Sequence, residues 1–424
     1  MNGSSSDYTP RFVDGLLDEL MSELSAVMVI GPRACGKTTT AARRARTIVR
    51  LDEPNVASVF HAAPDVALAA AEPPVLLDEW QEVPEVLGAV KRAVDSTPGP
   101  GRFLLTGSVR ARHTAEQWAG TGRVTPVEMF GLTVAEQRGA SDSRELLDTL
   151  FGATAFRPAL VPNPPDLASY LDLVLRGGFP EAVRLGDRAR AAWLEGYLDQ
   201  LVRRDAPNVA PVRSPGRLMA VLRTLAVCTA GSPTETTLAA AAGVDVRTLR
   251  AYLDLLEDLR IIERLPAWHS NRLTRLVKSP KYHVIDPGLA AVLMGVDRMA
   301  ALRNGDALGR LLETFVVAQL RPLLRLGAVQ VGMTHLRDRG GDHEVDLVLE
   351  TRSGDVIAIE VKAAGRVQSR DAAHLVWLRD RLEDQFRLGV VFYTGAAVVP
   401  LGDRIVALPI AAMWSPAALH SVTA

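Results

Sequence analysis

A glycine-rich loop between a predicted strand and a predicted helix constrains this 424-residue chain more than any other segment. The loop reads Gly31-Pro-Arg-Ala-Cys-Gly-Lys-Thr38 and matches the pattern G-x-x-x-x-G-K-[ST]. The apolar run Ala26–Ile30 predicts a buried strand, and the run from Thr38 to Arg46 predicts a helix. This turn directs backbone N–H groups and a helix N-terminus toward phosphate oxygens. The sequence therefore predicts a nucleotide-binding α/β domain with a parallel sheet.

The side chains of the loop suit ATP with Mg²⁺. The Lys37 ammonium would reach the β- and γ-phosphates, and the Thr38 hydroxyl would coordinate Mg²⁺. Cys35 is either a redox-sensitive thiol or a small residue that fits the loop, and the second interpretation is the simpler one. The residues expected to contact the nucleotide here are Gly31, Pro32, Arg33, Ala34, Cys35, Gly36, Lys37, Thr38 and Thr39.

A second nucleotide motif, Val75-Leu-Leu-Asp-Glu79, ends another apolar strand. Asp78 is expected to hold Mg²⁺ through its water shell, and Glu79 is expected to act as the catalytic group that polarises the attacking water. Two acids after an apolar strand are common on surfaces, but here a phosphate-binding loop precedes them. The pair therefore completes the predicted ATPase site.

A third strand, Phe103–Thr106, leads into the hydroxyl of Ser108. By similarity to ATPases of the AAA type, Thr106 or Ser108 would lie beside the γ-phosphate as a polar sensor; ordinary turn chemistry is the alternative. Three arginines follow, of which one could act as an arginine finger toward a neighbouring subunit, although a surface ion pair is the favoured explanation for any single one of them. They are Arg110, Arg112 and Arg123.

The composition argues against several classes of protein. The net charge of −1 excludes a general attraction to nucleic acid, so any DNA contact must use a local basic patch. No apolar stretch is long enough to cross a membrane, and the polar start of the chain, expected to be disordered, has no apolar signal-peptide segment. Cys35 and Cys228 indicate neither a disulfide framework nor a zinc site. We expect a protein of the reducing cytoplasm.

Lysine is rare in this chain. Of 48 basic residues only five are lysines, so arginine supplies almost every positive charge. A lysine retained against this bias can mark a position that needs a compact ammonium. The five are Lys37, Lys91, Lys278, Lys281 and Lys362.

The order of the predicted elements divides the chain into five segments. Alternating strands and helices indicate a parallel sheet, and candidate strands are 26–30, 48–51, 75–78, 103–106 and 124–129. We expect a disordered tail at 1–10, an ATPase core at 11–150, a helical lid and linker at 151–215, a winged helix at 216–295 and a nuclease-like α/β domain at 296–424.

The winged helix is predicted from helices at 218–230, 237–242 and 245–259, followed by wing strands at 261–265 and 281–285. Arg247 and Arg250 begin the presumed recognition helix. Three acids of that helix, Asp254, Glu257 and Asp258, argue against DNA, and such modules also act as ATPase lids or protein-docking units. The residues expected to contact DNA are Arg247, Arg250, Arg272, Arg275, Lys278 and Lys281.

Two strands near the C-terminus, 344–350 and 356–362, predict a β-hairpin. If its loop is 351–355, Asp346 lies opposite Glu360, with about 5 Å between their Cβ atoms. Paired carboxylates attract a divalent cation, either Mg²⁺ or Mn²⁺, and the catalytic Lys362 would orient water or stabilise a phosphate. Glu313, on an apolar helix face, is expected to be a third metal ligand. The alternative is an edge strand with solvated charges.

Together these motifs resemble a prokaryotic family of AAA-type ATPases fused to a C-terminal domain with the PD-(D/E)xK restriction-endonuclease fold. The resemblance rests on GPRACGKTT, LLDEWQEVP, FLLTGS, GGFPE, YHVIDPGLA, LLETFV, and EVD followed by IEVK. It implies nucleotide roles for Lys37, Thr38, Asp78 and Glu79. It implies nuclease positions for Glu313, Asp346, Glu360 and Lys362, although Val345 replaces the usual proline before the first acid.

The leading hypothesis is an ATPase that acts on DNA, with its ATP state coupled to a winged helix and a metal-dependent nuclease-like domain. The alternative is a nucleotide-switched regulator, or a defence or toxin–antitoxin component, that binds DNA or protein without cutting. Expected partners are DNA, further copies of the chain and an unidentified protein. No membrane partner is expected.

Overall fold

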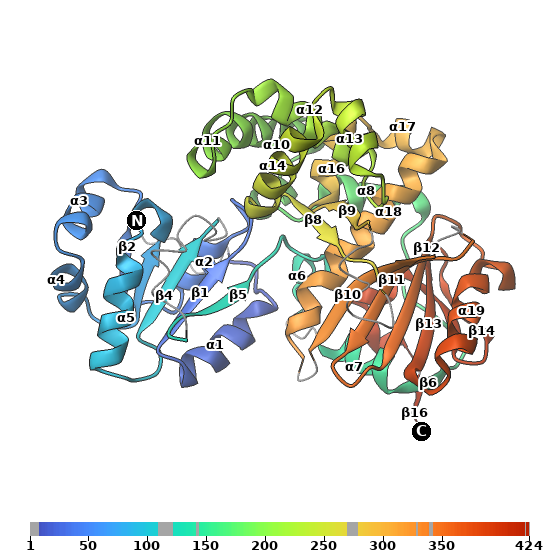
Figure 1. Ribbon diagram of the computed structural model, residues 1–424. Helices are drawn as coiled ribbons and strands as arrows, with labels where there is room; N and C mark the ends of the chain where they lie inside the picture. Colours follow the sequence, from blue (N-terminus) through green and yellow to red (C-terminus); the bar gives the residue numbers. More distant parts are fainter. Residues whose placement is uncertain are drawn as a thin grey trace. The chain divides into compact units, whose positions relative to one another are not determined.

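The computed structural model describes residues 8–108, 122–140, 144–268, 279–327, 330–338, 342–419 and 421–423 (Figure 1). The chain packs into two compact units. The N-terminal unit comprises the chain up to Leu132 together with the short segments Phe179–Glu181 and Asp258–Arg260. The C-terminal unit comprises Thr133–Gly178, Ala182–Glu257 and the chain from Ile261 onward. The five domain boundaries expected from the sequence stay predictions.

The N-terminal unit contains a five-stranded sheet in which every pair of neighbours is parallel. Its order is β2-β3-β4-β1-β5, so β4 lies between β1 and β3. The predicted strands are all present, with shifts of one residue at some ends. Their bounds are β1 Ala26–Ile30, β2 Thr47–Arg50, β3 Val75–Asp78, β4 Phe103–Gly107 and β5 Thr125–Glu128.

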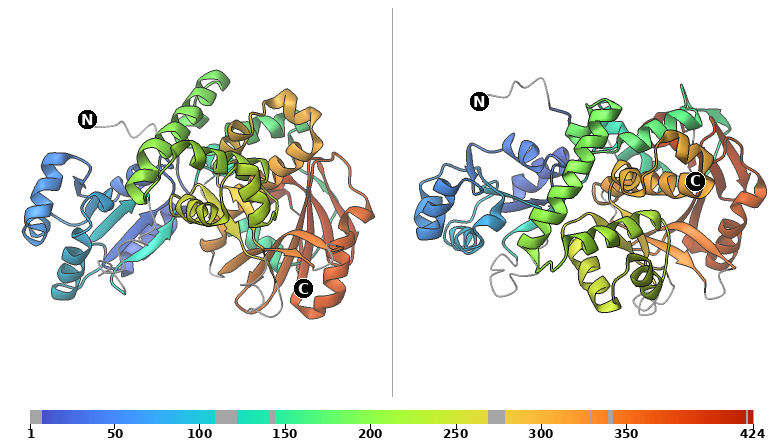
Figure 2. Two further views of the ribbon diagram at one scale, coloured as in Figure 1. Left: turned by 45° about the horizontal axis from the view of Figure 1, so that its top comes forward. Right: turned by 90° about the horizontal axis from the view of Figure 1, so that it is seen from above.

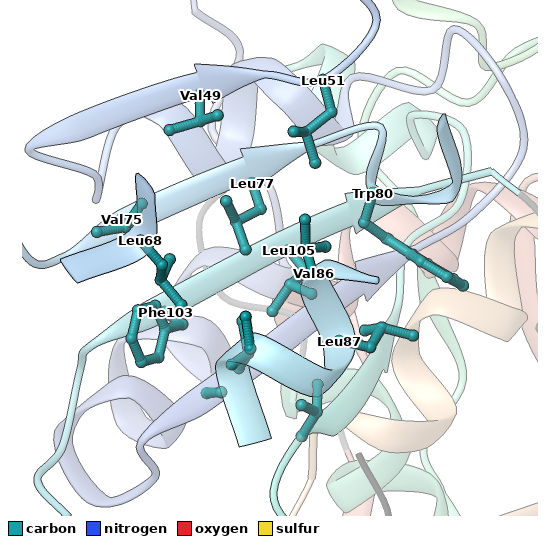
Figure 3. Packing of buried hydrophobic residues seen from close by; sticks show 14 of the residues in the cluster. Val49, Leu51, Leu68, Val75, Leu77, Trp80, Val86, Leu87, Phe103 and Leu105 are labelled. Atoms are coloured by element: carbon teal, nitrogen blue, oxygen red, sulfur yellow. The ribbon is translucent and has the colours of Figure 1, made fainter. Parts of the chain in front are cut away.

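Helices cover both faces of this sheet because its central strands are apolar on both sides. Ala26 and Met28 of β1 enter one core, and Val27 and Val29 enter another. Figure 3 shows part of the first core, where Leu77 and Leu105 pack with residues of α5. The first core is lined by α3 Pro54–Ala62, α4 Pro64–Ala69 and α5 Val86–Ser96, and the second by α1 Val13–Glu23 and α2 Lys37–Ala42.

The C-terminal unit begins with helices. Three of them, α12 to α14, precede the antiparallel hairpin β8–β9, in which Ile262 pairs with Val284. Helix α12 ends at Val227 and not at Ala230 as expected, and Ala230 has a left-handed backbone with φ 58° that cannot continue a helix. The elements of this part of the chain, in which Pro180, Glu181 and Asp258 are counted with the N-terminal unit, are α6 Val134–Gln137, α7 Arg144–Gly152, β6 Ala153–Phe156, α8 Leu167–Arg176, α9 Pro180–Val183, α10 Asp187–Gln200, a π-helical turn Leu201–Asp205, α11 Ala206–Val209, α12 Pro215–Val227, α13 Glu235–Ala242, α14 Val246–Asp258, β8 Ile262–Leu265 and β9 Lys281–Val284.

A mixed seven-stranded sheet of order β10-β11-β12-β13-β15-β14-β7 forms the rest of this unit. The strands β10, β11 and β12 form an antiparallel meander, and β13 then pairs parallel to β12 after a crossover through α19. The predicted hairpin loop is correct, because Glu350 pairs with Val356. The strands are β7 Ala159–Leu160, β10 Val331–Arg337, β11 Glu344–Thr351, β12 Val356–Lys362, β13 Phe386–Tyr393, β14 Ala397–Gly402 and β15 Ile405–Pro409; β16 Ser421–Thr423 pairs with β6.

Helices α18 and α19 pack on this sheet (Figure 2). Helix α19, Ala373–Leu382, contributes Leu375 and Leu378 to the core beneath it. Helix α18, Gly305–Leu320, packs against β12 and carries Glu313, and it follows α16 Pro287–Met294 and α17 Arg298–Arg303. Within the described ranges, no helix combines the length and apolar character needed to cross a membrane.

Replacing Leu105 with alanine tests the core of the N-terminal unit. The Leu105 side chain is fully buried in β4, so we expect the free energy of unfolding to fall by about 2–5 kcal/mol as methyl groups are lost and a cavity remains. Urea denaturation followed by circular dichroism measures the change. Ile48→Ala is the matched control, because Ile48 is 45% exposed on β2. Equal losses in the two variants would contradict the packing described here.

Candidate functional site

Two glycines allow the loop after β1 to form. A Cβ atom added to Gly31 would lie 2.1 Å from the carbonyl oxygen of Met129, so no larger residue fits there without movement of the backbone. Gly36 has φ 100°, a conformation that residues with a side chain rarely adopt. The loop therefore needs glycine at both positions, as the sequence pattern predicts.

Lys37 and Thr38 start α2 at the end of this loop. The Lys37 side chain is only 4% exposed, and its ammonium donates to the carbonyl oxygen of Pro32 at 2.9 Å. The Thr38 hydroxyl donates to a carboxylate oxygen of Asp78 at 2.7 Å. A hydroxyl and a carboxylate from two motifs thus meet, and both are oxygen ligands of the kind that Mg²⁺ prefers. These residues fit the expected Mg²⁺ site.

Thr106 links the acids of the second motif to β4. Its hydroxyl donates to Asp78 and accepts the backbone N–H of Glu79 at 3.3 Å. Ser108, the other candidate sensor, is buried, and its hydroxyl has no hydrogen-bond partner among the described residues. Thr106 therefore positions Asp78 and Glu79, whereas Ser108 keeps its hydroxyl available.

Glu79 has a left-handed backbone with φ 54°. Its carboxylate accepts a hydrogen bond from the side-chain amide of Gln81, two residues along the chain. Strained backbone of this kind persists where the surrounding contacts hold it, and it often occurs at functional residues. The sequence motif predicts Glu79 but gives no signal for Gln81.

The remaining residues predicted for nucleotide contact differ in exposure. Cys35 is fully buried, with its sulfur 3.8 Å from the carbonyl oxygen of Met129, so the structure favours a packing role over redox chemistry. Thr39 and Ala34 are exposed, Pro32 is buried and Arg33 is intermediate. Arg123 forms a surface ion pair with Asp95. Arg110 and Arg112 lie outside the described residues.

Arg11 supports the loop and was not predicted from the sequence. Its guanidinium is buried and donates to the carbonyl oxygens of Cys35 at 2.9 Å and of Phe130 at 2.7 Å. The contact joins the start of the chain to the phosphate-binding loop. Both acceptors are backbone oxygens, which have no residue signature, so the sequence contains no signal for this contact.

A carboxylate cluster lies in the C-terminal unit around Lys281, the first residue of β9. The Lys281 ammonium contacts a carboxylate oxygen of Glu313 at 2.8 Å and one of Asp346 at 3.3 Å, and it lies 3.9 Å from Glu344. Its side chain is 1% exposed. Burial lowers the pKa of Lys281, but the nearby carboxylates outweigh burial and hold that pKa above its ordinary value.

Glu360 forms a second ion pair in the same cluster, with Lys362 at 2.7 Å. Burial and the Asp346 carboxylate raise the pKa of Glu360 to about 8. The strand pairing extends to Leu347 opposite Ile359, and Asp346 then accepts the backbone N–H of Val361 at 2.9 Å. Burial and Asp346 also raise the pKa of Glu313 well above its ordinary value.

The predicted metal ligands Glu313, Asp346 and Glu360 require a correction. Their elements bring them into one cluster, as the sequence predicts, but the Lys281 ammonium contacts two of them and Lys362 contacts the third. Among the residues that the structure describes, no three His, Cys, Asp or Glu side chains form a group able to hold a metal ion. The donor set therefore does not fit a divalent metal in this arrangement.

The predicted DNA contacts divide into three groups. Arg247 and Arg250 are exposed on α14, and Arg250 pairs with Glu235 at 2.6 Å. Lys281 requires a correction, because a buried ammonium bound to carboxylates cannot reach a phosphate. The scarcity of lysine in this chain is the signal that could have indicated a role for Lys281 other than DNA contact, since a retained lysine can mark a position that needs a compact ammonium. Arg272, Arg275 and Lys278 lie outside the described residues.

The acids of α14 are held by Arg264. Its guanidinium contacts Asp254 at 2.7 Å and also contacts Glu257. Asp258 is buried. The negative charge that argued against DNA binding is therefore partly compensated within the unit.

Three protein-family models match the chain. Residues 24–137 match an AAA domain, a range that includes the phosphate-binding loop, Asp78, Glu79 and Thr106. Residues 167–300 match a domain of unknown function (DUF8612), and residues 308–413 match another (DUF4143). Most of the AAA match lies in the N-terminal unit, and this match supports a nucleotide-hydrolysing ATPase.

Curated relatives cover most of the chain. Uncharacterized proteins of Mycobacterium tuberculosis and Mycobacterium bovis are each 29% identical to it over 392 residues, which is 90% of this chain and 79% of theirs. Among solved structures, a Walker-type ATPase of Pyrococcus abyssi is 17% identical and has a TM-score of 0.42, with 68% of this chain and 97% of that chain covered.

Gly31→Ala tests the geometry of the loop. We expect binding of a fluorescent ADP analogue to weaken about tenfold or more, because a clash with the Met129 carbonyl costs ~1–3 kcal/mol or moves the loop. Gly15→Ala in α1 is the matched control, since a Cβ there meets no atom within 4 Å. Unchanged nucleotide affinity in Gly31→Ala would show that the loop does not have the described geometry.

Proposed function

We propose that this chain is a Mg²⁺-dependent ATPase whose nucleotide state governs DNA binding by the C-terminal unit. The contact of Thr38 with Asp78 carries the first part of the proposal, because it brings the phosphate-binding loop and the second acidic motif to one point. The match of residues 24–137 to an AAA domain supports it.

The residues of this site have separate roles. Lys37 would bind the β- and γ-phosphates, and Thr38 with Asp78 would hold Mg²⁺, which neutralises phosphate charge. Glu79 would orient the attacking water and accept its proton. Thr106 keeps Asp78 and Glu79 in register through its hydroxyl. The amide of Gln81 binds the Glu79 carboxylate, so Glu79 must leave that contact or share it when it acts on water.

The DNA-binding part of the proposal rests on α12–α14 and the hairpin β8–β9. Three helices followed by a two-stranded hairpin are the arrangement of a winged helix, and its recognition helix would be α14. The Asp245 carboxylate caps that helix by accepting the N–H of Thr248 at 2.9 Å. Exposed Arg247 and Arg250 lie in its first turns. The ion pairs of Arg264 with Asp254 and Glu257 reduce the repulsion that a phosphate would meet.

The C-terminal sheet supports a restriction-endonuclease-like fold for this part of the unit. The helix α18, the meander β10–β12, the crossover helix α19 and the parallel strand β13 follow in that order, and the hairpin carries Asp346, Glu360 and Lys362. The fold does not decide whether DNA is cut. Because Lys281 occupies the carboxylates that a catalytic metal would need, its contacts favour DNA binding without cleavage. A cytoplasmic location, an oligomer and a protein partner stay predictions.

Lys37→Ala tests the ATPase. We expect the purified protein to hydrolyse ATP and this variant to lose hydrolysis, because the Lys37 ammonium is the group expected on the transferred phosphate. Glu79→Gln should still bind ATP but hydrolyse it about 10²-fold more slowly or worse. Phosphate release measures both rates. Lys91→Ala, which makes the same substitution at an exposed lysine of α5, is the control and should keep its activity. Full activity in Lys37→Ala would refute the site.

Arg247→Ala tests the DNA-binding face. We expect its affinity for duplex DNA to fall about fivefold and the salt slope of binding to decrease by about 1, as the loss of one phosphate contact requires. Fluorescence anisotropy at several salt concentrations measures both changes. Arg188→Ala, an exposed position on α10, is the matched control. If both variants bind DNA like the parent, the helices serve protein docking instead.

A further inference from the structure

The Lys281 ammonium has the donors and the burial of a resident cation. Its three N–H groups have three acceptors within 3.4 Å: a Glu313 carboxylate oxygen at 2.8 Å, an Asp346 carboxylate oxygen at 3.3 Å and the Asp346 carbonyl oxygen at 3.4 Å. With 1% of the side chain exposed, water cannot replace these partners. The ammonium is therefore bound as fully as an ion in a closed site.

A divalent metal would compete for the same oxygens. Mg²⁺ and Ca²⁺ need oxygen ligands at about 2.0–2.6 Å, and carboxylates supply the charge that holds them. Lys281 already contacts two of the three carboxylates, and Lys362 holds the third at 2.7 Å. A metal at the Glu313 and Asp346 oxygens would meet the charge of the Lys281 ammonium, whose side chain is 1% exposed, so their repulsion would be poorly screened.

We infer that the Lys281 ammonium is the permanent cation of this cluster and takes the place that a divalent metal would occupy. The inference rests on the proposed fold of the C-terminal sheet, since that fold suggests the metal. The cluster then stabilises structure and does not cut DNA. The cluster links β9 to α18 and to β11. One ion-pair network therefore holds the β8–β9 hairpin against the seven-stranded sheet.

The position of Lys281 in the chain makes this connection important. Lys281 is the first residue of β9, and His283, two residues later, is also buried, 3.8 Å from Glu313. Burial and the Lys281 charge lower the pKa of His283 well below its ordinary value. The ammonium of Lys281 is therefore the cation that β9 brings to Glu313.

Lys281→Met in the full chain is the direct test. This substitution keeps the length of the side chain and removes its charge, which leaves buried carboxylates uncompensated. We expect the unfolding midpoint to fall by about 10 °C. Lys281→Met/Glu313→Gln should recover a large part of that loss, because it removes the carboxylate as well. Lys91→Met, at an exposed ion pair with Asp95, is the matched control and should shift the midpoint little.

Metal binding provides the second measurement. The nucleotide-free protein is titrated with Mn²⁺, and binding is followed by electron paramagnetic resonance. We expect the parent and Asp346→Asn to bind the same amount of Mn²⁺, because the parent has no Mn²⁺ site at Asp346. In Lys281→Met, we expect Mn²⁺ binding that depends on Asp346 and a midpoint that rises when Mn²⁺ is added. If Lys281→Met does not fold, the unfolding midpoint of Lys281→Met/Glu313→Gln and the Mn²⁺ titration of the parent still test the inference.

Two results would overturn the inference. One is Mn²⁺ binding or Mn²⁺-dependent DNA cleavage by the parent protein that Asp346→Asn abolishes. The other is a Lys281→Met variant as stable as Lys91→Met. Assays of ATP hydrolysis and DNA affinity on the same preparations separate this inference from the proposed function, because neither assay depends on whether the cluster holds a metal.

Discussion

The position of β4 between β1 and β3 is the constraint on which the nucleotide site depends. In a parallel sheet, the carboxyl ends of all strands lie at one edge, so the residues that follow these three strands meet there. Thr38 and Asp78 are forty residues apart in the chain, yet their oxygen atoms are 2.7 Å apart. Thr106 can reach both Asp78 and Glu79 because its strand lies beside theirs. Buried cores on both faces keep the strands in this order.

The C-terminal unit adds buried charge to an apolar core of its own. Glu313 and Glu360 are buried acids, and a buried carboxylate is stable only with a partner or a proton. The two lysines supply those partners from different elements, Lys281 from β9 and Lys362 from β12. The Lys362–Glu360 pair lies within β12, whereas the contacts of Lys281 join β9 to α18 and to β11, so the Lys281 contacts that neutralise the acids also hold these three elements together. A cluster of acids is thus compatible with a structural role as well as with a metal site.

Much of the fold could be predicted from the sequence because its signals are local. Apolar runs before the loop and before Asp78 predicted β1 and β3, and a five-residue loop predicted the pairing of Glu350 with Val356. The corrections concern contacts between distant segments. Arg11 binds backbone oxygens that carry no residue signature, and Gln81, two residues from Glu79, is the local exception. Lys281 looked like one basic residue of a wing, and nothing within its own segment places it beside Glu313.

The sequence by itself determined the phosphate-binding loop of the N-terminal unit and its link to the second acidic motif, because glycine at two positions, a lysine, a threonine and two acids permit few other arrangements. It also determined that Asp346, Glu360 and Lys362 share one hairpin. Only the tertiary structure decided which cation meets those acids. A carboxylate attracts metal, ammonium or proton alike, and the choice depends on which positive group the fold brings within about 3 Å. Here β9 brings the ammonium of Lys281.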